Sequence, residues 1–307
     1  MPGTYPAAAP TLSGDQLTIS RFLQSPALIQ RRLRDYRDLR FVSDQILTQR
    51  FRSNGGAVQY EMSEPFVSDR TAEAVGAGST YPYANLPTGT AAIAAIQKWG
   101  QKALLTDEEI ERNAYAGSAV DRAFRKVINS IISQVDSITM SAIASAVTQS
   151  FAVTTAWNAA SPTILRDILR AKAIPLGLNL GYNMDTLVIN DTQYAYMMTD
   201  STLTNTWRRE ATDNPVYTGE VERVAGLNII ISPNLPANTA YVLDSQQLGG
   251  MADEMGGAPG YAVSDLAVQV KSIRRDDQDA WDVQARRKTV PVVQEPGAAV
   301  KLTGLGI

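Results

Sequence analysis

Residues 106–147 read TDEEIERNAYAGSAVDRAFRKVINSIISQVDSITMSAIASAV, and this stretch decides the fold. Its first four residues form a capping box, because the Thr106 hydroxyl can accept a hydrogen bond from the Glu109 N–H while the Glu109 carboxylate reaches back. Helical spacings of three and four then separate the apolar residues Ile110, Ala114, Val120, Phe124, Val127, Ile128, Ile131, Val135, Ile138 and Ala142. The pattern predicts a helix that can break near Gly117. If it runs unbroken to Val147 it is ~60 Å long, far longer than the usual helix of ~11–12 residues.

The segment that follows this helix alternates helix and strand signals. Ser161-Pro162 predicts a helix start, and short apolar runs between turn residues predict buried strands. The expected elements are a helix to about Leu176, a strand at 186–190, a helix at 192–198 capped by Asn190 or Asp191, and strands at 227–231 and 241–243. Together they predict an α/β domain of roughly a hundred residues, a size at which domains commonly stand alone.

The C-terminal part has the period-two alternation of β-strands with one buried face. The apolar positions are Leu266, Val268 and Val270, then Trp281, Val283 and Ala285, and finally Val300 and Leu302. Asp276, Asp277 and Asp279 lie between the first two runs and form the densest acidic cluster. A calcium loop would need a glycine after its third aspartate and a later glutamate. Because Ala280-Trp281 instead resumes a strand, we expect a hairpin tip rather than a metal site.

Upstream of the helix, the first 55 residues contain eight arginines against four aspartates. Ser25-Pro26 predicts the start of a short amphipathic helix that includes Arg31, Arg32 and Arg34. Its charge favours a solvated helix face, and the alternative is an arm that binds an acidic surface, either this protein's own body or nucleic acid. The turn sequence Ser53-Asn-Gly-Gly56 follows, between residues 46–52 and 57–62. It predicts that these two segments form a β-hairpin.

Between this predicted hairpin and the long helix lies an unusual segment. Residues 74–97 carry no charge, and their glycines and prolines forbid a long helix. Long loops without periodicity are uncommon in compact domains and, when ordered, are usually functional. Because the segment contains Tyr81, Tyr83 and Leu86 but cannot form a core of its own, we expect these side chains to be covered by a neighbouring subunit.

The overall composition limits the chemistry available to the chain. Its 307 residues contain no cysteine and no histidine, which excludes thiol nucleophiles, disulfides, Ser-His-Asp triads and histidine-based zinc sites. Phosphate-binding glycine loops and a Ser-x-x-Lys pair are also missing. No secretory signal is visible at the start, so the cytosol is the default location. The uncharged stretch 137–165 is rich in Ser, Thr, Asn and Gln, so we expect a buried helix and a loop rather than a membrane span.

Several short motifs, taken in order, resemble one family. They are RRLRD (31–35), GGAVQYE (55–61), DTLVIN (185–190), DNPVYTG (213–219), LGGMADE (248–254) and VPVVQEPGAA (290–299). With the basic arm, the uncharged loop, the long helix and the α/β block, they resemble the Hong Kong 97-type major capsid proteins of tailed double-stranded DNA bacteriophages. The similarity is closest to the capsid proteins of actinobacterial phages and prophages, and it extends over nearly the whole chain from about Leu17.

The resemblance implies an α+β fold with five segments. These are an N-terminal arm (1–45), a hairpin and extended loop (46–104), a peripheral domain with its spine helix (105–159), an axial domain (160–260), and the C-terminal strands of the peripheral domain (261–307). It implies inter-subunit contacts at Tyr81, Tyr83, Leu86, Arg31, Arg32 and Arg34. Lys98 and Lys102 lie on the shank of the loop, which argues against the lysine crosslinks that some relatives form.

The same resemblance implies a structural role without catalysis, cofactor or metal. Subunits would form hexamers and pentamers of an icosahedral head that encloses double-stranded DNA non-specifically, assembled in the host bacterial cytoplasm and without a membrane. A separate scaffolding protein, a portal and a decoration protein are the implied partners, because too little chain precedes the arm to hold a scaffold. The alternatives are an encapsulin-like cargo shell, a tail or decoration protein, and a carboxylate-metal hydrolase that uses the Asp276 cluster.

Overall fold

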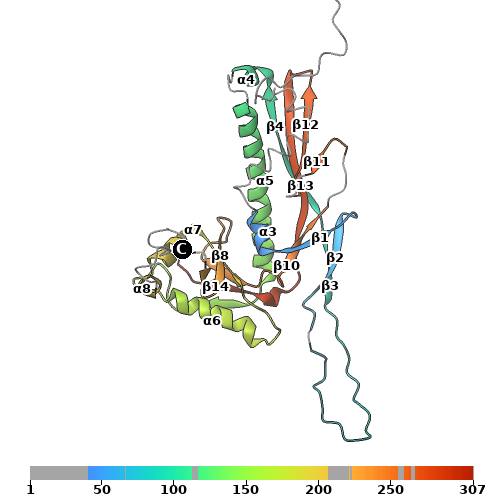
Figure 1. Cartoon of the computed structure of the whole chain (residues 1–307), viewed down its shortest axis with the longest axis vertical. Helices are drawn as coiled ribbons and strands as arrows, with labels where there is room; N and C mark the ends of the chain where they lie inside the picture. The colour runs from blue at the N-terminus through green and yellow to red at the C-terminus, as the bar shows by residue number, and fades with distance from the viewer. Residues whose placement is uncertain are drawn as a thin grey trace, which may run out of the picture.

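A computed structural model describes residues 41–65, 67–112, 117–206, 221, 223–254, 259–263 and 267–306. Several features expected from the sequence therefore lie outside the described residues. They are the arginine-rich helix with Arg31, Arg32 and Arg34, the DNPVYTG motif at 213–219, and Leu266. The described chain combines two large sheets with one dominant helix, as the α+β prediction required (Figure 1).

A long helix is confirmed within the described residues. A short helix α4 (Asp107–Arg112) begins at the predicted cap, where the Glu109 N–H donates to the Thr106 hydroxyl at 3.3 Å. The main helix α5 (Gly117–Ala146) starts at the predicted glycine and, at 1.5 Å per residue, is ~45 Å long rather than ~60 Å. One side of α5 is buried, as the spacing predicted, at Val120, Phe124, Val127, Ile128, Ile131 and Val135. Further along, the predicted Ile138 and Ala142 are only partly buried, and Ile143 is buried instead.

The buried side of α5 packs against the first sheet. The order of this sheet is β1 (Gln49–Arg52), β10 (Gly249–Asp253), β13 (Ala280–Val293), β12 (Gln269–Arg275) and β11 (Ala262–Val263), and β4 (Gln97–Thr106) pairs with the other side of β13. In Figure 1 the helix runs alongside β4 and β13 for most of their length. Over the described residues, α5 is also the single helix apolar and long enough to cross a membrane, between Arg122 and Ala146, but half of that window is buried in protein.

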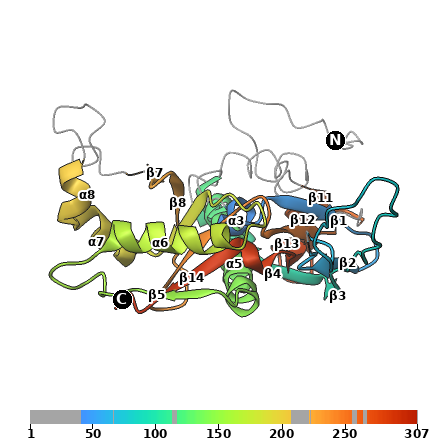
Figure 2. The same cartoon turned by 90° about the horizontal axis from the view of Figure 1, so that it is seen from below.

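The second sheet forms a separate block at one end of α5 (Figures 1 and 2). Its order is β5 (Ser150–Ala152), β14 (Ala299–Thr303), β9 (Thr239–Leu243), β6 (Thr186–Ile189), β8 (Leu227–Ile231) and β7 (Arg223–Val224). The block includes the helices α6 (Ile164–Gly177), α7 (Asp191–Thr199) and α8 (Ser201–Thr206). The predicted strands and helices are confirmed here, including the Asn190 cap, whose side chain accepts from the Gln193 N–H at 2.7 Å. Helix α6 begins after Thr163 rather than at Ser161-Pro162.

The predicted hairpin of 46–52 with 57–62 is wrong. Residues 42–46 form the helix α3 (Val42–Ile46), and β1 pairs in parallel with β10. The strand β2 (Ala57–Met62) pairs instead with β3 (Thr90–Ala95). The chain bends at the Asn-Gly sequence, with Gly56 at φ 74°, but the strands on either side enter different sheets. Gly250 in β10 makes the β1 pairing possible, because a Cβ there would collide with the Gln49 oxygen. Gly249 likewise lets β13 approach, because a Cβ there would collide with the Val292 oxygen.

Two strands depart from the expected segment boundaries. Strand β10 lies within 160–260, the predicted axial domain, yet it pairs with β13 in the sheet that packs on α5. Strand β14 lies within 261–307, the predicted peripheral strands, yet it pairs with β9 and β5 in the other sheet. The chain thus crosses between the two blocks at each of these strands, where β10 lies between β1 and β13 and β14 lies between β5 and β9. The division into arm, loop, peripheral and axial domains otherwise stays a prediction.

Candidate assembly site

The uncharged segment forms an extended loop that projects away from both sheets (Figure 1). Strands β2 and β3 form its stem, with Ala57 opposite Ala95 and Met62 opposite Thr90. Tyr81, Tyr83 and Leu86 lie on the loop beyond this stem and are 82%, 97% and 84% exposed. The loop is therefore a long arm of chain whose apolar side chains find no cover within the subunit.

Hydrogen bonds across the loop limit its freedom. The backbone N–H of Asn85 donates to Asp69 Oδ1 at 2.9 Å, and the Asn85 amide nitrogen donates to Oδ2 at 3.0 Å. The two sides of the loop are joined at that point, 16 residues apart in sequence. Tyr81 and Tyr83 lie in the segment between the two joined residues, so these hydrogen bonds limit the conformations of the chain that carries both aromatic side chains.

Glu295 joins the stem of the loop to the second sheet. Its Oε1 accepts from the Glu64 N–H at 3.2 Å, and its Oε2 accepts from the Tyr182 hydroxyl at 3.1 Å. Beside it, the Ser63 N–H donates to the Gln294 oxygen at 3.0 Å. Burial and the neighbouring Glu295 charge raise the pKa of Tyr182 to about 12, so this phenol stays a hydrogen-bond donor. The sequence named Glu295 only as part of the motif at 290–299 and did not predict that this residue joins the loop to the second block.

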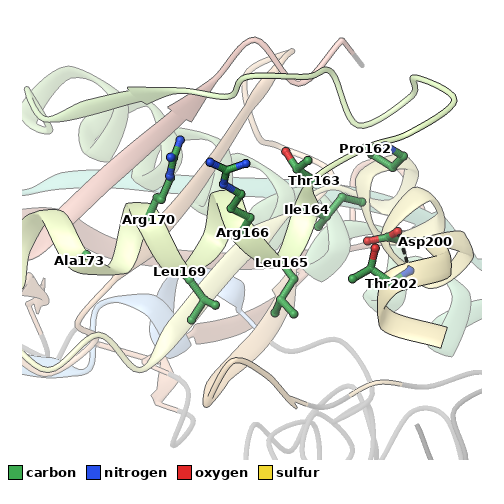
Figure 3. A pocket seen from close by; sticks show the side chains of 10 residues that line it. All are labelled: Pro162, Thr163, Ile164, Leu165, Arg166, Leu169, Arg170, Ala173, Asp200 and Thr202. Atoms are coloured by element: carbon green, nitrogen blue, oxygen red, sulfur yellow. Dashed lines mark hydrogen bonds between the residues drawn. The ribbon is translucent and has the colours of Figure 1, made fainter. Parts of the chain in front are cut away.

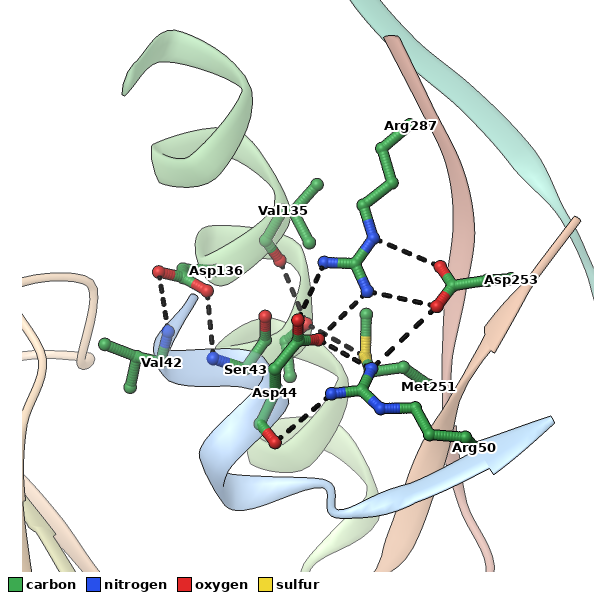
Figure 4. A network of polar contacts seen from close by, with 10 residues as sticks. Val42, Ser43, Asp44, Arg50, Val135, Asp136, Met251, Asp253 and Arg287 are labelled. Carbon is green, nitrogen blue, oxygen red and sulfur yellow. Dashed lines mark hydrogen bonds and ion pairs between the residues drawn. The ribbon is translucent and has the colours of Figure 1, made fainter. Parts of the chain in front are cut away.

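A buried ionic network holds α3, the start of the described chain, against the first sheet (Figure 4). Arg287 is 1% exposed and contacts Asp253 through Nε–Oδ1 at 3.1 Å and Asp44 through Nη2–Oδ1 at 2.9 Å. Arg50 adds a contact to Asp44 at 2.8 Å. Burial alone would lower the pKa of Arg287, but the charges of Asp44 and Asp253 outweigh it and raise the pKa. The network fixes the point where residues 1–40 join the body.

Asp136 on α5 holds α3 from the other side (Figure 4). Its carboxylate accepts from the Ser43 N–H at 2.9 Å and from the Val42 N–H at 3.3 Å, two donors that the first turn of a helix leaves unpaired. Burial raises the pKa of Asp136. Sequence analysis missed both anchors, although one signal existed. Arg287 continues the alternation of the buried residues Val283 and Ala285, and a charge at a buried strand position requires a partner.

The acidic cluster forms the predicted hairpin tip between β12 and β13. Asp276 and Asp279 are highly exposed, and both contact Arg274, at 3.2 and 3.5 Å. Arg274 also forms a bidentate pair with Asp107, whose pKa the hydrogen bond from Arg274 lowers. Within the described residues, no three acidic side chains are grouped as a metal site would require. The tip thus ties the first turn of α4 to the end of the sheet.

A groove of about 450 Å³ lies on the second block, between α6 and α8 (Figure 3). Leu165 and Leu169 form its apolar side, and Arg166 and Arg170 project beside them. Asp200, at the other side, accepts from the Thr202 N–H at 3.0 Å. Its lining side chains offer no arrangement of nucleophile and base, so the groove is an open surface feature.

The family model for phage capsid protein matches residues 89–302, about seven tenths of the chain. This chain belongs to the phage capsid protein family. The match includes β4, α5, both sheets and part of the extended-loop stem. Among curated proteins, none matches the sequence.

Solved capsid and virus-like-particle structures share the fold at low sequence identity. The capsid of the cyanophage P-SCSP1u aligns with a TM-score of 0.61 and 16% identity, covering 83% of this chain and 85% of that one. The native gene transfer agent (GTA) capsid aligns at 0.59 with 10% identity, covering 86% and 91%. A virus-like particle from Pyrococcus furiosus aligns at 0.58 with 12% identity, covering 91% and 100%.

These matches agree with the resemblance drawn from the sequence. The phage capsid protein has a Hong Kong 97-like capsid fold, and it is a structural shell subunit of the virion capsid. The virus-like particle has the same fold, so the fold alone does not separate a phage head from an encapsulin-like shell. The family match favours the phage head. The contacts expected at Tyr81, Tyr83, Leu86 and the three arm arginines stay predictions.

Proposed function

We propose that this capsid protein forms hexamers and pentamers that close an icosahedral head around double-stranded DNA. The observation that supports the proposal most directly is the projecting extended loop. Its tip carries large apolar side chains on an uncharged chain that cannot cover them. Aromatic residues are enriched at protein interfaces, and an exposed patch of this kind typically marks a contact with a partner.

The proposal gives the loop a neighbouring subunit as its partner. Tyr81, Tyr83 and Leu86 become buried on assembly, and the Asp69–Asn85 closure holds the tip in shape before contact. A second copy of the chain is the economical partner, because a shell of identical subunits presents the same receiving surface at every contact. Arg31, Arg32 and Arg34 in the arm form the second contact, with an acidic surface of a neighbour.

Further partners complete the proposed head. A separate scaffolding protein guides assembly in the host bacterial cytoplasm, a portal occupies one vertex, and a decoration protein covers the outside. The packaged double-stranded DNA is bound without sequence preference. The chain performs no catalysis in this role, which agrees with its lack of histidine and cysteine and with the structural nature of the family.

Leu86→Asp tests the loop contact. The variant should remain folded, because Leu86 is 84% exposed in the subunit, but it should form few shells. Burying an unpaired carboxylate at an interface costs several kcal/mol. Leu86→Met is the matched control and should assemble like the wild type. Negative-stain microscopy and sedimentation velocity measure the shells, and circular dichroism checks the fold. Wild-type yields of shells from Leu86→Asp would refute the contact.

A further inference from the structure

The outer face of α5 is open to solvent along most of the length of the helix. Between residues 122 and 146 the exposed side chains are all cationic or neutral and polar, without a carboxylate or a large apolar group. They are Arg122, Arg125, Lys126, Asn129, Ser130, Ser133, Gln134, Ser137, Ser141 and Ser145. Asp136 is the one acidic residue in that range, and it is buried against Val42 and Ser43.

A groove of about 370 Å³ between α5 and β4 extends this face. Lys102, Arg122 and Lys126 line it together with Ser130, and Glu109 is the carboxylate among the lining residues. Lys102 contacts Asp282 at 3.3 Å, but that same oxygen also accepts from Arg275 at 2.8 Å. Two cations thus share one buried carboxylate, and the groove keeps an excess of positive charge.

The chemistry of this face suits a polyanion better than another protein. Protein–protein interfaces are depleted in lysine and serine at their cores and enriched in aromatic residues, as the extended loop is. Phosphate oxygens of nucleic acid are bound mainly by arginine and lysine together with serine, asparagine and glutamine side chains. The α5 face contains these residue types and no others. Figure 2 shows that α5 covers one side of the first sheet, so the side chains that are exposed on α5 are those not packed against it.

We propose that the exposed face of α5, with the α5–β4 groove, is the surface that contacts the phosphate backbone of the packaged double-stranded DNA. The inference rests on the proposed function, since a head must enclose DNA for this face to meet it. It also orients the subunit, because the face then lines the interior of the shell. The contact is not sequence-specific: the cations bind phosphates, and the neutral side chains donate hydrogen bonds without repelling them.

The test compares two charge variants of the full chain in its unassembled form. In the first, Lys126, Ser133 and Ser137 become glutamates, which places three carboxylates along the face. In the second, Arg166→Glu with Arg170→Glu makes the same change in formal charge on α6. Fluorescence anisotropy measures binding of a random-sequence duplex over a series of salt concentrations. Negative-stain microscopy of each variant records separately whether shells form.

The wild type should bind duplex DNA at low salt, and the α5 variant should bind at least about tenfold more weakly. Its salt slope should fall by about 0.9 for the lost lysine, and the α6 variant should stay within about twofold of the wild type. Lys126→Glu alone provides the smaller version of the effect if the triple variant misfolds. Equal weakening by both variants, or no binding by the wild type, would overturn the inference. If wild-type shells form but do not bind DNA, the inference about α5 is overturned while the proposed shell function still stands.

Discussion

Replacing Arg287 with methionine removes the centre of the network that holds α3 against the first sheet. Methionine fills much of the same space without the charge, so the perturbation is mainly electrostatic. Asp253, with its side chain 6% exposed, would keep only a long contact to Arg50 at 3.8 Å, and Asp44 would keep Arg50 at 2.8 Å. The variant would also lose the guanidinium that lies 4.5 Å from the ring centre of Phe41.

The geometry indicates that Arg287→Met lowers the free energy of unfolding substantially. Arg287 is 1% exposed and makes charge-assisted bonds to two carboxylates. Breaking one partner of a buried ionic group typically costs about 3–5 kcal/mol, because the charges left behind are not compensated. For a chain of this size that corresponds to a drop in Tm of roughly 5–8 °C. Surface ion pairs contribute about 0–1 kcal/mol, so the two cases are well separated.

The assay is thermal and urea unfolding of the unassembled chain at fixed concentration, because assembly itself would add apparent stability. Arg275→Met is the matched control. It removes an arginine that pairs with the buried Asp282 at 2.8 Å, but Lys102 remains 3.3 Å from that carboxylate. Burial would raise the pKa of Asp282, yet the two cations lower it on balance, so one of them should preserve most of the stability.

The pH dependence can be tested on the control variant. Burial would raise the pKa of Asp282, but Arg275 and Lys102 lower it in the folded chain, so the stability from this pairing is present at pH 7 and is lost as the pH falls through the folded-state pKa. The smaller stability deficit of Arg275→Met should therefore shrink further at low pH. The reasoning is refuted if Arg287→Met unfolds within about 2 °C of the wild type at pH 7. It is equally refuted if its deficit matches that of Arg275→Met.

Two further substitutions test the arm and the acidic tip. Replacing Arg31, Arg32 and Arg34 together with alanine should leave the fold intact by circular dichroism but reduce the yield of shells at low salt. The difference from the wild type should shrink at high salt, because the Debye length falls from ~10 Å at 0.1 M to ~3 Å at 1 M and weakens the wild-type contact as well; unchanged assembly at every salt concentration would remove the electrostatic role. Replacing Asp276, Asp277 and Asp279 with asparagine should change stability by no more than about 0.5–1 kcal/mol and leave shells normal, since the tip is solvated and asparagine tolerates the positive φ of Asp279. Calorimetry that detected calcium or magnesium binding lost in this variant would instead assign a metal site to the tip.

Local patterns in the sequence determined several elements correctly. The spacing of apolar residues from Val120 onward predicted the buried side of α5, and Gly117 marked its start. The strand at 186–189 and its Asn190 cap followed from a short apolar run and a capping residue. The charge-free loop and the hairpin tip at 276–279 were likewise predicted from the sequence. Each of these features depends on the conformations and hydrogen bonds of residues close together in the chain, which the sequence displays directly.

Pairing between distant segments was decided only in the tertiary structure. Alternation in residues 46–62 indicated strands but could not show that β1 pairs with β10, some two hundred residues later, or that β14 joins the second sheet. Arg287 occupied a buried register in the sequence, yet its partner Asp44 is 243 residues away. The residue pattern of a strand indicates which of its faces is buried. It does not indicate which other strand will pair with it, or which acidic residue will lie beside a buried arginine, because both depend on distant parts of the chain. That choice depends on the packing of the whole subunit, because desolvated charges and open sheet edges must be satisfied wherever the fold places them.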